Sequence, residues 1–192
     1  GSVLDLEGTG QHVRFPPGVG YARTFAAVVK WRGGAAGQPI LDFGAGAART
    51  LRLTPASDRN TLCCEIDAGN GVQRLEWTRA LPKHEWAHVA VTFDSARGIL
   101  YVNGAAVATN AAIKVSPVDV RPQTNYLGAS RLTPGLSFNG QVALFQAHGR
   151  ALTAEELRAP VIRLIEPLDG SSFEPGGRVR LVPTQEFGLS VA

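Results

Sequence analysis

Short runs of alternating apolar and polar residues recur along the chain, and each run is closed by glycine, proline, asparagine or aspartate. The run Phe25–Trp31 is apolar except for Lys30, and as an extended strand it places Phe25, Ala27, Val29 and Trp31 on one face. Helical periodicity is nearly absent. Only 153–157 fits a helix, with Thr153 as the N-cap and Glu156 three residues later. This pattern predicts an all-β fold of roughly ten short strands.

The other expected strands occur at regular intervals. They are residues 39–43, 50–54, 61–67, 72–77, 85–94, 99–102, 125–128 and 140–147. Gly69–Gly71 joins two of them as a hairpin turn, Ser95–Gly98 joins two more, and Asn103-Gly104 is a further turn signal. Roughly ten strands with a single helical turn predict an antiparallel jelly-roll β-sandwich.

Composition excludes several classes of protein. The 192 residues are 44% hydrophobic and 18% charged, which suits a folded core. No apolar run is long enough for membrane insertion. The net charge of +3 comes from scattered basic residues, whereas a nucleic-acid partner requires a cluster. The adjacent Cys63 and Cys64 favour neither a disulfide nor a zinc site.

The character of the sequence changes after Pro160. Residues 161–165 and 179–182 are expected strands, too few to form a core of their own. We therefore expect a jelly-roll domain at 1–159 and a C-terminal β extension, or a truncated second domain, at 160–192. The chain contains no methionine, so we also expect it to be a piece of a longer protein.

An ordered set of motifs resembles the bacterial laminin-G-like, concanavalin A-like jelly roll over residues 3–158. The matching segments are residues 4–8, 11–13, 86–94, 100–104, 125–128, 138–140 and 150–157. Residues 165–173 are similar to the first strands of a bacterial immunoglobulin-like module. The resemblance implies a mostly non-catalytic module of a secreted or cell-surface protein, attached to neighbouring domains of the same polypeptide.

Some jelly rolls of this kind hold a calcium ion where the first strand meets the strand after Phe138. They commonly carry an Asp-Glu pair after the glycine that matches Gly140, whereas this chain has Gln141 and Val142. Calcium prefers several oxygen ligands. The remaining oxygen donors that could hold Ca²⁺ here are Asp5, Glu7, Asn139 and Gln141.

Sugar binding usually needs an exposed aromatic ring beside polar groups that fix the hydroxyls. The candidate ligand-binding residues are Trp31, Trp77, Tyr126, Glu76 and Arg79. Trp86 matches a core position of the family it resembles, and Tyr101 shares a strand face with Ile99. We therefore expect both in the core.

Two carboxylates raise the alternative of an enzyme. Glu65 and Asp67 share a strand face and are similar to the Glu-x-Asp motif of laminarinase-type hydrolases, but the second glutamate of that motif is missing, since residues 68–70 read Ala-Gly-Asn. The leading hypothesis is a non-catalytic, lectin-like module that binds polysaccharide or glycoconjugate. The alternatives are a structural or adhesive spacer, and a glycoside hydrolase or lyase.

Overall fold

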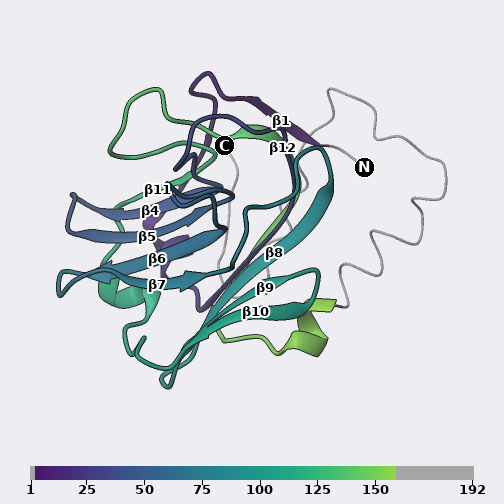
Figure 1. Cartoon of the computed structure of the whole chain (residues 1–192). Helices are drawn as coiled ribbons and strands as arrows, with labels where there is room; N and C mark the ends of the chain where they lie inside the picture. Colours follow the sequence, from purple (N-terminus) through teal and green to yellow (C-terminus); the bar gives the residue numbers. More distant parts are fainter. Residues whose placement is uncertain (1–2, 159–192) are drawn as a thin grey trace.

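The computed structural model describes residues 3–158, which form two six-stranded antiparallel sheets packed face to face (Figure 1). Sheet A has the order β1-β12-β3-β8-β9-β10, and sheet B the order β2-β11-β4-β5-β6-β7. The strands of sheet A are β1 Leu4–Glu7, β3 Thr24–Trp31, β8 Trp86–Phe93, β9 Gly98–Val102, β10 Ala105–Asn110 and β12 Asn139–His148. Those of sheet B are β2 Val13–Phe15, β4 Leu41–Ala45, β5 Arg49–Thr54, β6 Cys63–Ala68, β7 Gln73–Glu76 and β11 Thr124–Leu127. The all-β jelly-roll prediction is confirmed.

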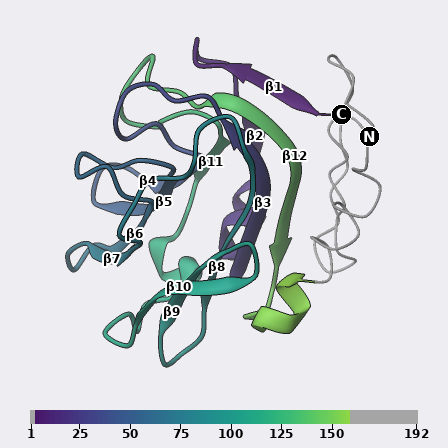
Figure 2. The same cartoon turned by 45° about the vertical axis from the view of Figure 1, so that its right-hand side comes forward.

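The core lies between the two sheets, as the strand alternation predicts. Along β3, Phe25, Ala27, Val29 and Trp31 are all buried in the central cluster. The ring of Phe25 meets that of Phe43 on sheet B edge to face, with centroids 5.4 Å apart. Figure 2 shows the two layers from the side, with the curved β12 and β3 opposite β4 to β7.

The expected hairpins are confirmed. β6 pairs with β7 across the turn at 69–71, and β8 pairs with β9. Asn103 and Gly104 adopt positive φ angles of 50° and 76° and lead directly into β10. The sequence analysis does not predict β10, because its residues are small, weakly alternating and mostly exposed or half-buried at the edge of sheet A.

The chain also forms two 3-10 helices among the described residues. The helix η1 Pro17–Tyr21 lies between β2 and β3, and η2 Pro117–Val120 lies between β10 and β11. Residues 154–158 are helical, and the capping box is confirmed. The Thr153 N–H donates to Glu156 Oε2, and the Glu156 N–H donates to Thr153 Oγ1. Within residues 3–158, no helix has the length and apolar character needed to cross a bilayer. The expectations for 160–192 concern residues outside the described part of the chain.

Candidate functional site

One row of side chains crosses the outer face of sheet B from edge to edge. Direct cross-strand partners follow one another in the order Arg14, Tyr126, Asp42, Arg52, Glu65 and Arg74. Directly opposite residues of an antiparallel pair share a face, and the neighbours of this row, such as Leu51 and Ile66, belong to the core. The row therefore points away from the core.

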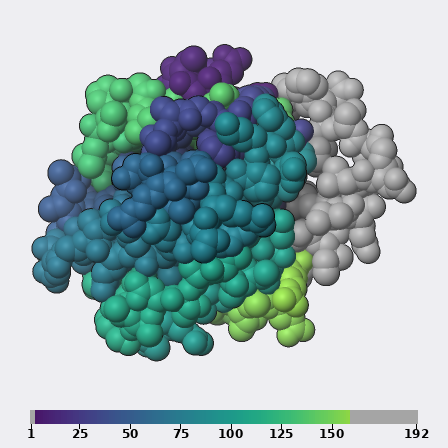
Figure 3. Space-filling view, viewed as in Figure 1, coloured from purple at the N-terminus to yellow at the C-terminus, as the bar shows by residue number. Residues whose placement is uncertain are grey.

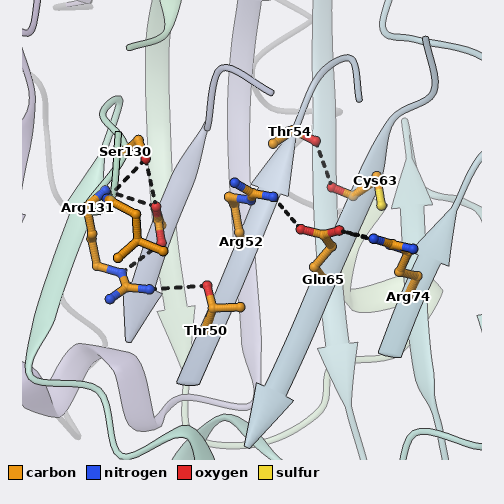
Figure 4. Close-up of polar contacts among 10 residues, drawn as sticks. Thr50, Arg52, Thr54, Cys63, Glu65, Arg74, Ser130 and Arg131 are labelled. Carbon is orange, nitrogen blue, oxygen red and sulfur yellow. Dashed lines mark hydrogen bonds and ion pairs between the residues drawn. The ribbon is translucent and has the colours of Figure 1, made fainter. Parts of the chain in front are cut away.

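Glu65 binds two arginines at once (Figure 4). Its Oε2 is 2.5 Å from Arg52 Nη2, and its Oε1 accepts from Arg74 Nε at 2.9 Å. Burial raises the pKa of Glu65, but the hydrogen bonds and charges of Arg52 and Arg74 outweigh burial and hold that pKa below its usual value. Glu65 is therefore ionised at neutral pH and has no proton to donate as a general acid.

Asp67 stabilises the hairpin turn that follows it. Its Oδ1 accepts backbone N–H groups of Gly69, Asn70 and Gly71 at 2.7, 3.1 and 3.1 Å. Glu65 and Asp67, the two carboxylates on which the hydrolase hypothesis rests, are thus both engaged in structural contacts. Their arrangement gives that hypothesis no support.

A buried ion pair ties the loop after β11 to sheet B. Arg131 Nε is 2.8 Å from Asp42 Oδ1, and the two side chains are only 4% and 1% exposed. Arg131 also donates to the Gly46 carbonyl and to Thr50 Oγ1, at 3.1 and 3.2 Å. The sequence analysis missed this pair, because 89 residues separate its members.

A polar hollow of about 210 Å³ lies beside the Glu65 ion pairs. Its lining residues are Ala36, Gly37, Arg52, Thr54, Ser57, Asp58, Cys63, Glu65 and Arg74. Burial, together with the charges of Glu65 and Glu76, raises the pKa of the Cys63 thiol to about 12. The thiol therefore stays protonated and adds no charge to the hollow.

A second hollow, the tryptophan hollow, has a volume of about 350 Å³. Its lining residues are Trp77, Arg79, Pro82, Glu85, Trp86, Ala87, Val102, Asn103, Ala105 and Val107. The guanidinium carbon of Arg79 lies 4.3 Å from the centroid of the Trp77 ring. Both indoles are partly exposed.

The expectation that Trp86 lies in the core is wrong. Trp86 is the first residue of β8 and pairs with Lys30, whereas the next residue, Ala87, faces the core. Successive side chains of a strand point to opposite faces, so Trp86 turns outward. The ammonium of Lys30 lies 5.4 Å from the centroid of its ring.

The two hollows border the same edge strand. Arg74, on β7, lines the polar hollow, and Trp77, directly after β7, lines the tryptophan hollow. In the space-filling view the surface of β4 to β7 continues without a break into that of β8 to β10 (Figure 3).

The structure brings together only some of the predicted ligand-binding residues. Trp77 and Arg79 share the tryptophan hollow. Glu76 lies outside its lining and binds Thr61 and Arg59. Tyr126 lies three strands from β6 on the outer face of sheet B, with its ring centroid 4.4 Å from that of His12.

The prediction that Trp31 is a ligand-binding residue is wrong. Its side chain is 3% exposed and belongs to the central cluster, and its Nε1 donates to Gln38 Oε1 at 3.3 Å. Trp31 occupies a core-facing position of β3, so it offers no surface for a sugar. The Arg-Gly-Gly sequence that follows it made the ring look exposed at a strand end.

The four proposed calcium ligands do lie side by side on β1 and β12. Asp5 is opposite Gln141, and Glu7 is opposite Asn139. However, the Asp5 carboxylate contacts Arg32 Nη2 at 2.7 Å and accepts from Gln141 Nε2 at 3.0 Å.

Those contacts occupy the Asp5 carboxylate with a guanidinium and an amide. Burial raises the pKa of Asp5, but its bonds to Arg32 and Gln141 outweigh burial and lower that pKa overall. Across residues 3–158, no three His, Cys, Asp or Glu side chains are grouped to hold a metal ion. The donor set as arranged does not fit calcium. Calcium binding stays a prediction from the resemblance.

Two antiparallel sheets packed in this strand order define a jelly-roll sandwich of the concanavalin A-like type. The chain belongs to the concanavalin A-like lectin/glucanases superfamily, whose family model matches residues 7–158. No curated protein matches the chain.

Several solved structures share the fold. The carbohydrate-binding domain CBM40 of the Ruminococcus gnavus IT-sialidase is 18% identical, with a TM-score of 0.68 over 83% of this chain and 96% of its own. The same domain bound to alpha2,3 sialyllactose is 20% identical, with a TM-score of 0.64 over 83% and 99%. Domain 4 of AbnA, an extracellular arabinanase from Geobacillus stearothermophilus in complex with arabinotriose, is 17% identical, with a TM-score of 0.64 over 82% and 75%. At these identities the likeness establishes the fold.

Proposed function

We propose that this chain is a non-catalytic carbohydrate-binding module of a secreted or cell-surface protein. It holds polysaccharide or glycoconjugate by aromatic stacking and hydrogen bonds in the tryptophan hollow. The observation that carries the proposal is that two half-buried tryptophans, Trp77 and Trp86, are among the residues that line one hollow of about 350 Å³. That volume lies within the range of roughly 300–1,000 Å³ typical of small-molecule sites.

The lining of the tryptophan hollow matches the two kinds of surface that a sugar presents. The indole of Trp86 offers an apolar surface to the C–H face of a pyranose. Glu85 and Asn103 supply an acceptor and an amide for hydroxyl groups. Arg79, lying across Trp77, presents guanidinium N–H groups beside the ring.

The affinity of a single module should be modest. Each hydrogen bond to a sugar replaces one to water, so its net contribution is only about 0.5–1.5 kcal/mol. Repeated modules on one polypeptide would raise the overall avidity without new contacts.

The structural neighbours support a carbohydrate ligand, since they include complexes with sialyllactose and arabinotriose. The ion pairs of Glu65 and the turn contacts of Asp67 support a non-catalytic role. The arabinanase AbnA, to which domain 4 belongs, is extracellular, which supports a secreted or surface location.

The test is binding to a panel of neutral polysaccharides and oligosaccharides, including arabinan, cellulose, xylan and arabinotriose. We expect retention by at least one of them, and we expect Trp86→Ala to weaken it by roughly tenfold, because a stacked ring contributes about 0.5–1.5 kcal/mol beyond its buried area. Affinity electrophoresis with each soluble glycan measures the change.

Tyr21→Ala provides the matched control. Tyr21 is an aromatic residue that is 45% exposed, and it lies on η1, outside the tryptophan hollow. Its loss should leave retention unchanged. If no glycan in the panel is retained, or if Trp86→Ala binds as tightly as Tyr21→Ala, the proposal is wrong. The structural spacer then becomes the better account.

A further inference from the structure

We propose that the polar hollow on sheet B is a separate binding site for a sugar that carries a carboxylate group, such as a uronate unit of an acidic polysaccharide. The proposal goes beyond the function above, since it concerns different residues and a charged ligand. It rests on how Arg52, Glu65 and Arg74 are arranged and on the unused donors of the two arginines.

Glu65 holds two guanidinium groups in fixed positions. Arg52 and Arg74 project from β5 and β7, on either side of β6, and both point toward Glu65 (Figure 4). Their parent strands lie about 10 Å apart, since adjacent strands are spaced by about 4.8 Å. Groups that are already ordered lose less entropy when a ligand binds, so the two arginines are preorganised.

Both arginines keep donors that no protein group uses. A guanidinium has five N–H groups. In the part of the chain that the structure describes, Arg52 binds Glu65 through Nη2 and leaves Nη1 unused, while its Nε is buried out of reach of a ligand. Arg74 uses Nε and Nη2 and leaves Nη1 unused. Spare guanidinium donors favour a ligand rich in acceptors, and a planar carboxylate can accept two of their bonds at once.

The charges that line the hollow balance, since the guanidiniums of Arg52 and Arg74 face the carboxylates of Glu65 and Asp58. Both oxygens of Glu65 are engaged by the arginines, so Glu65 offers no free acceptor to repel an anion. Asp58 and Arg74 are both exposed, so water and salt screen the charges of both. The case for an anionic ligand therefore rests on the fixed guanidinium donors, and Asp58 opposes it.

The remaining lining residues are small and uncharged. Thr54 Oγ1 donates to the Cys63 carbonyl and Ser57 Oγ lies 2.7 Å from Thr61 Oγ1, so both hydroxyls already have partners within the wall of the hollow. Its volume of about 210 Å³ is below the range of roughly 300–1,000 Å³ for drug-sized sites, which limits the occupant to about one sugar unit.

The test compares an oligogalacturonate with the same oligosaccharide after its carboxyl groups have been reduced to alcohols. Isothermal titration calorimetry at low salt should show roughly tenfold tighter binding of the acidic form, since hydrogen bonds to charged groups are the stronger ones. Arg74→Gln should abolish that preference. Equal affinity for the acidic and reduced forms overturns the proposal.

Arg59→Gln is the matched control for Arg74→Gln. It removes the same charge from a nearby side chain that is 62% exposed and lies outside the hollow's lining. It should keep the preference for the acidic form. Equal losses in Arg59→Gln and Arg74→Gln would show a general charge effect and overturn the site.

Asp58→Asn gives an effect of the opposite sign, which a folding defect cannot imitate. Removing the negative charge at the rim should tighten binding of the acidic oligomer about twofold at low salt, where screening is weak. Binding of the reduced form should not change. The absence of any gain for the acidic form contradicts the electrostatic argument.

The two sites can fail independently. Trp86→Ala should leave the preference for the acidic oligomer intact. Retention of neutral glycans without any acidic preference overturns only the polar site, and the reverse result overturns only the tryptophan site.

Discussion

Replacing Asp42 with asparagine should lower the free energy of unfolding by about 3–5 kcal/mol, the cost of breaking a buried ion pair on one side. Asp42 is 1% exposed and accepts both the side chain and the backbone N–H of Arg131. Its loss would leave the guanidinium of Arg131, itself 4% exposed, without a counter-charge. Urea denaturation followed by circular dichroism measures the change.

The double variant Asp42→Asn with Arg131→Met tests whether the loss of stability comes from leaving a buried charge unpaired. Replacing both partners removes the uncompensated charge, so the double variant should be less destabilised than Asp42→Asn alone. A cost below about 1 kcal/mol for Asp42→Asn would mean that the pair behaves like a solvated surface salt bridge. The loop between β11 and β12 would then not depend on this ion pair for its stability.

Trp31→Ala should destabilise the protein by about 3–5 kcal/mol, as expected for removing a large aromatic side chain from a packed core. Trp31 is 3% exposed, and its loss also leaves Gln38 without its indole partner. Glycan binding by the folded fraction should not change, because Trp31 lines neither hollow. Thermal denaturation combined with affinity electrophoresis measures both properties.

Tyr21→Ala again serves as the reference, since substitution of an exposed aromatic residue usually changes stability by less than about 0.5 kcal/mol. If Trp31→Ala kept wild-type stability but lost glycan binding, the assignment of Trp31 to the core would be contradicted. The sequence-based hypothesis of a ligand platform at Trp31 would then return.

Local alternation predicted most of the sandwich because each strand must turn one face toward the core. The run Phe25–Trp31 became β3, and the turn at 69–71 joined β6 to β7. β10 escaped prediction because Ala105–Asn110 lies at a sheet edge and buries little, so its composition carries a weak pattern.

The candidate sites were less predictable, because they depend on register and on residues distant in the sequence. Trp77 and Arg79 are two residues apart, so their proximity followed from the sequence. The hairpin at 69–71 also carried a signal that was not used, since its register places Glu65 opposite Arg74. Arg52 joins them only through the pairing of β5 with β6, which no local pattern specifies.

The most direct test of carbohydrate binding uses the three tryptophans as separate reporters. Their indole N–H groups give three resonances in a proton-nitrogen NMR spectrum, which can be followed while arabinotriose, cellotriose or xylotriose is added. We predict that a bound oligosaccharide shifts the signals of Trp77 and Trp86, which line the tryptophan hollow, and leaves that of the buried Trp31 in place. Saturable binding that leaves Trp77 and Trp86 unmoved, or the absence of binding by all three sugars and by every glycan in the panel, would contradict it.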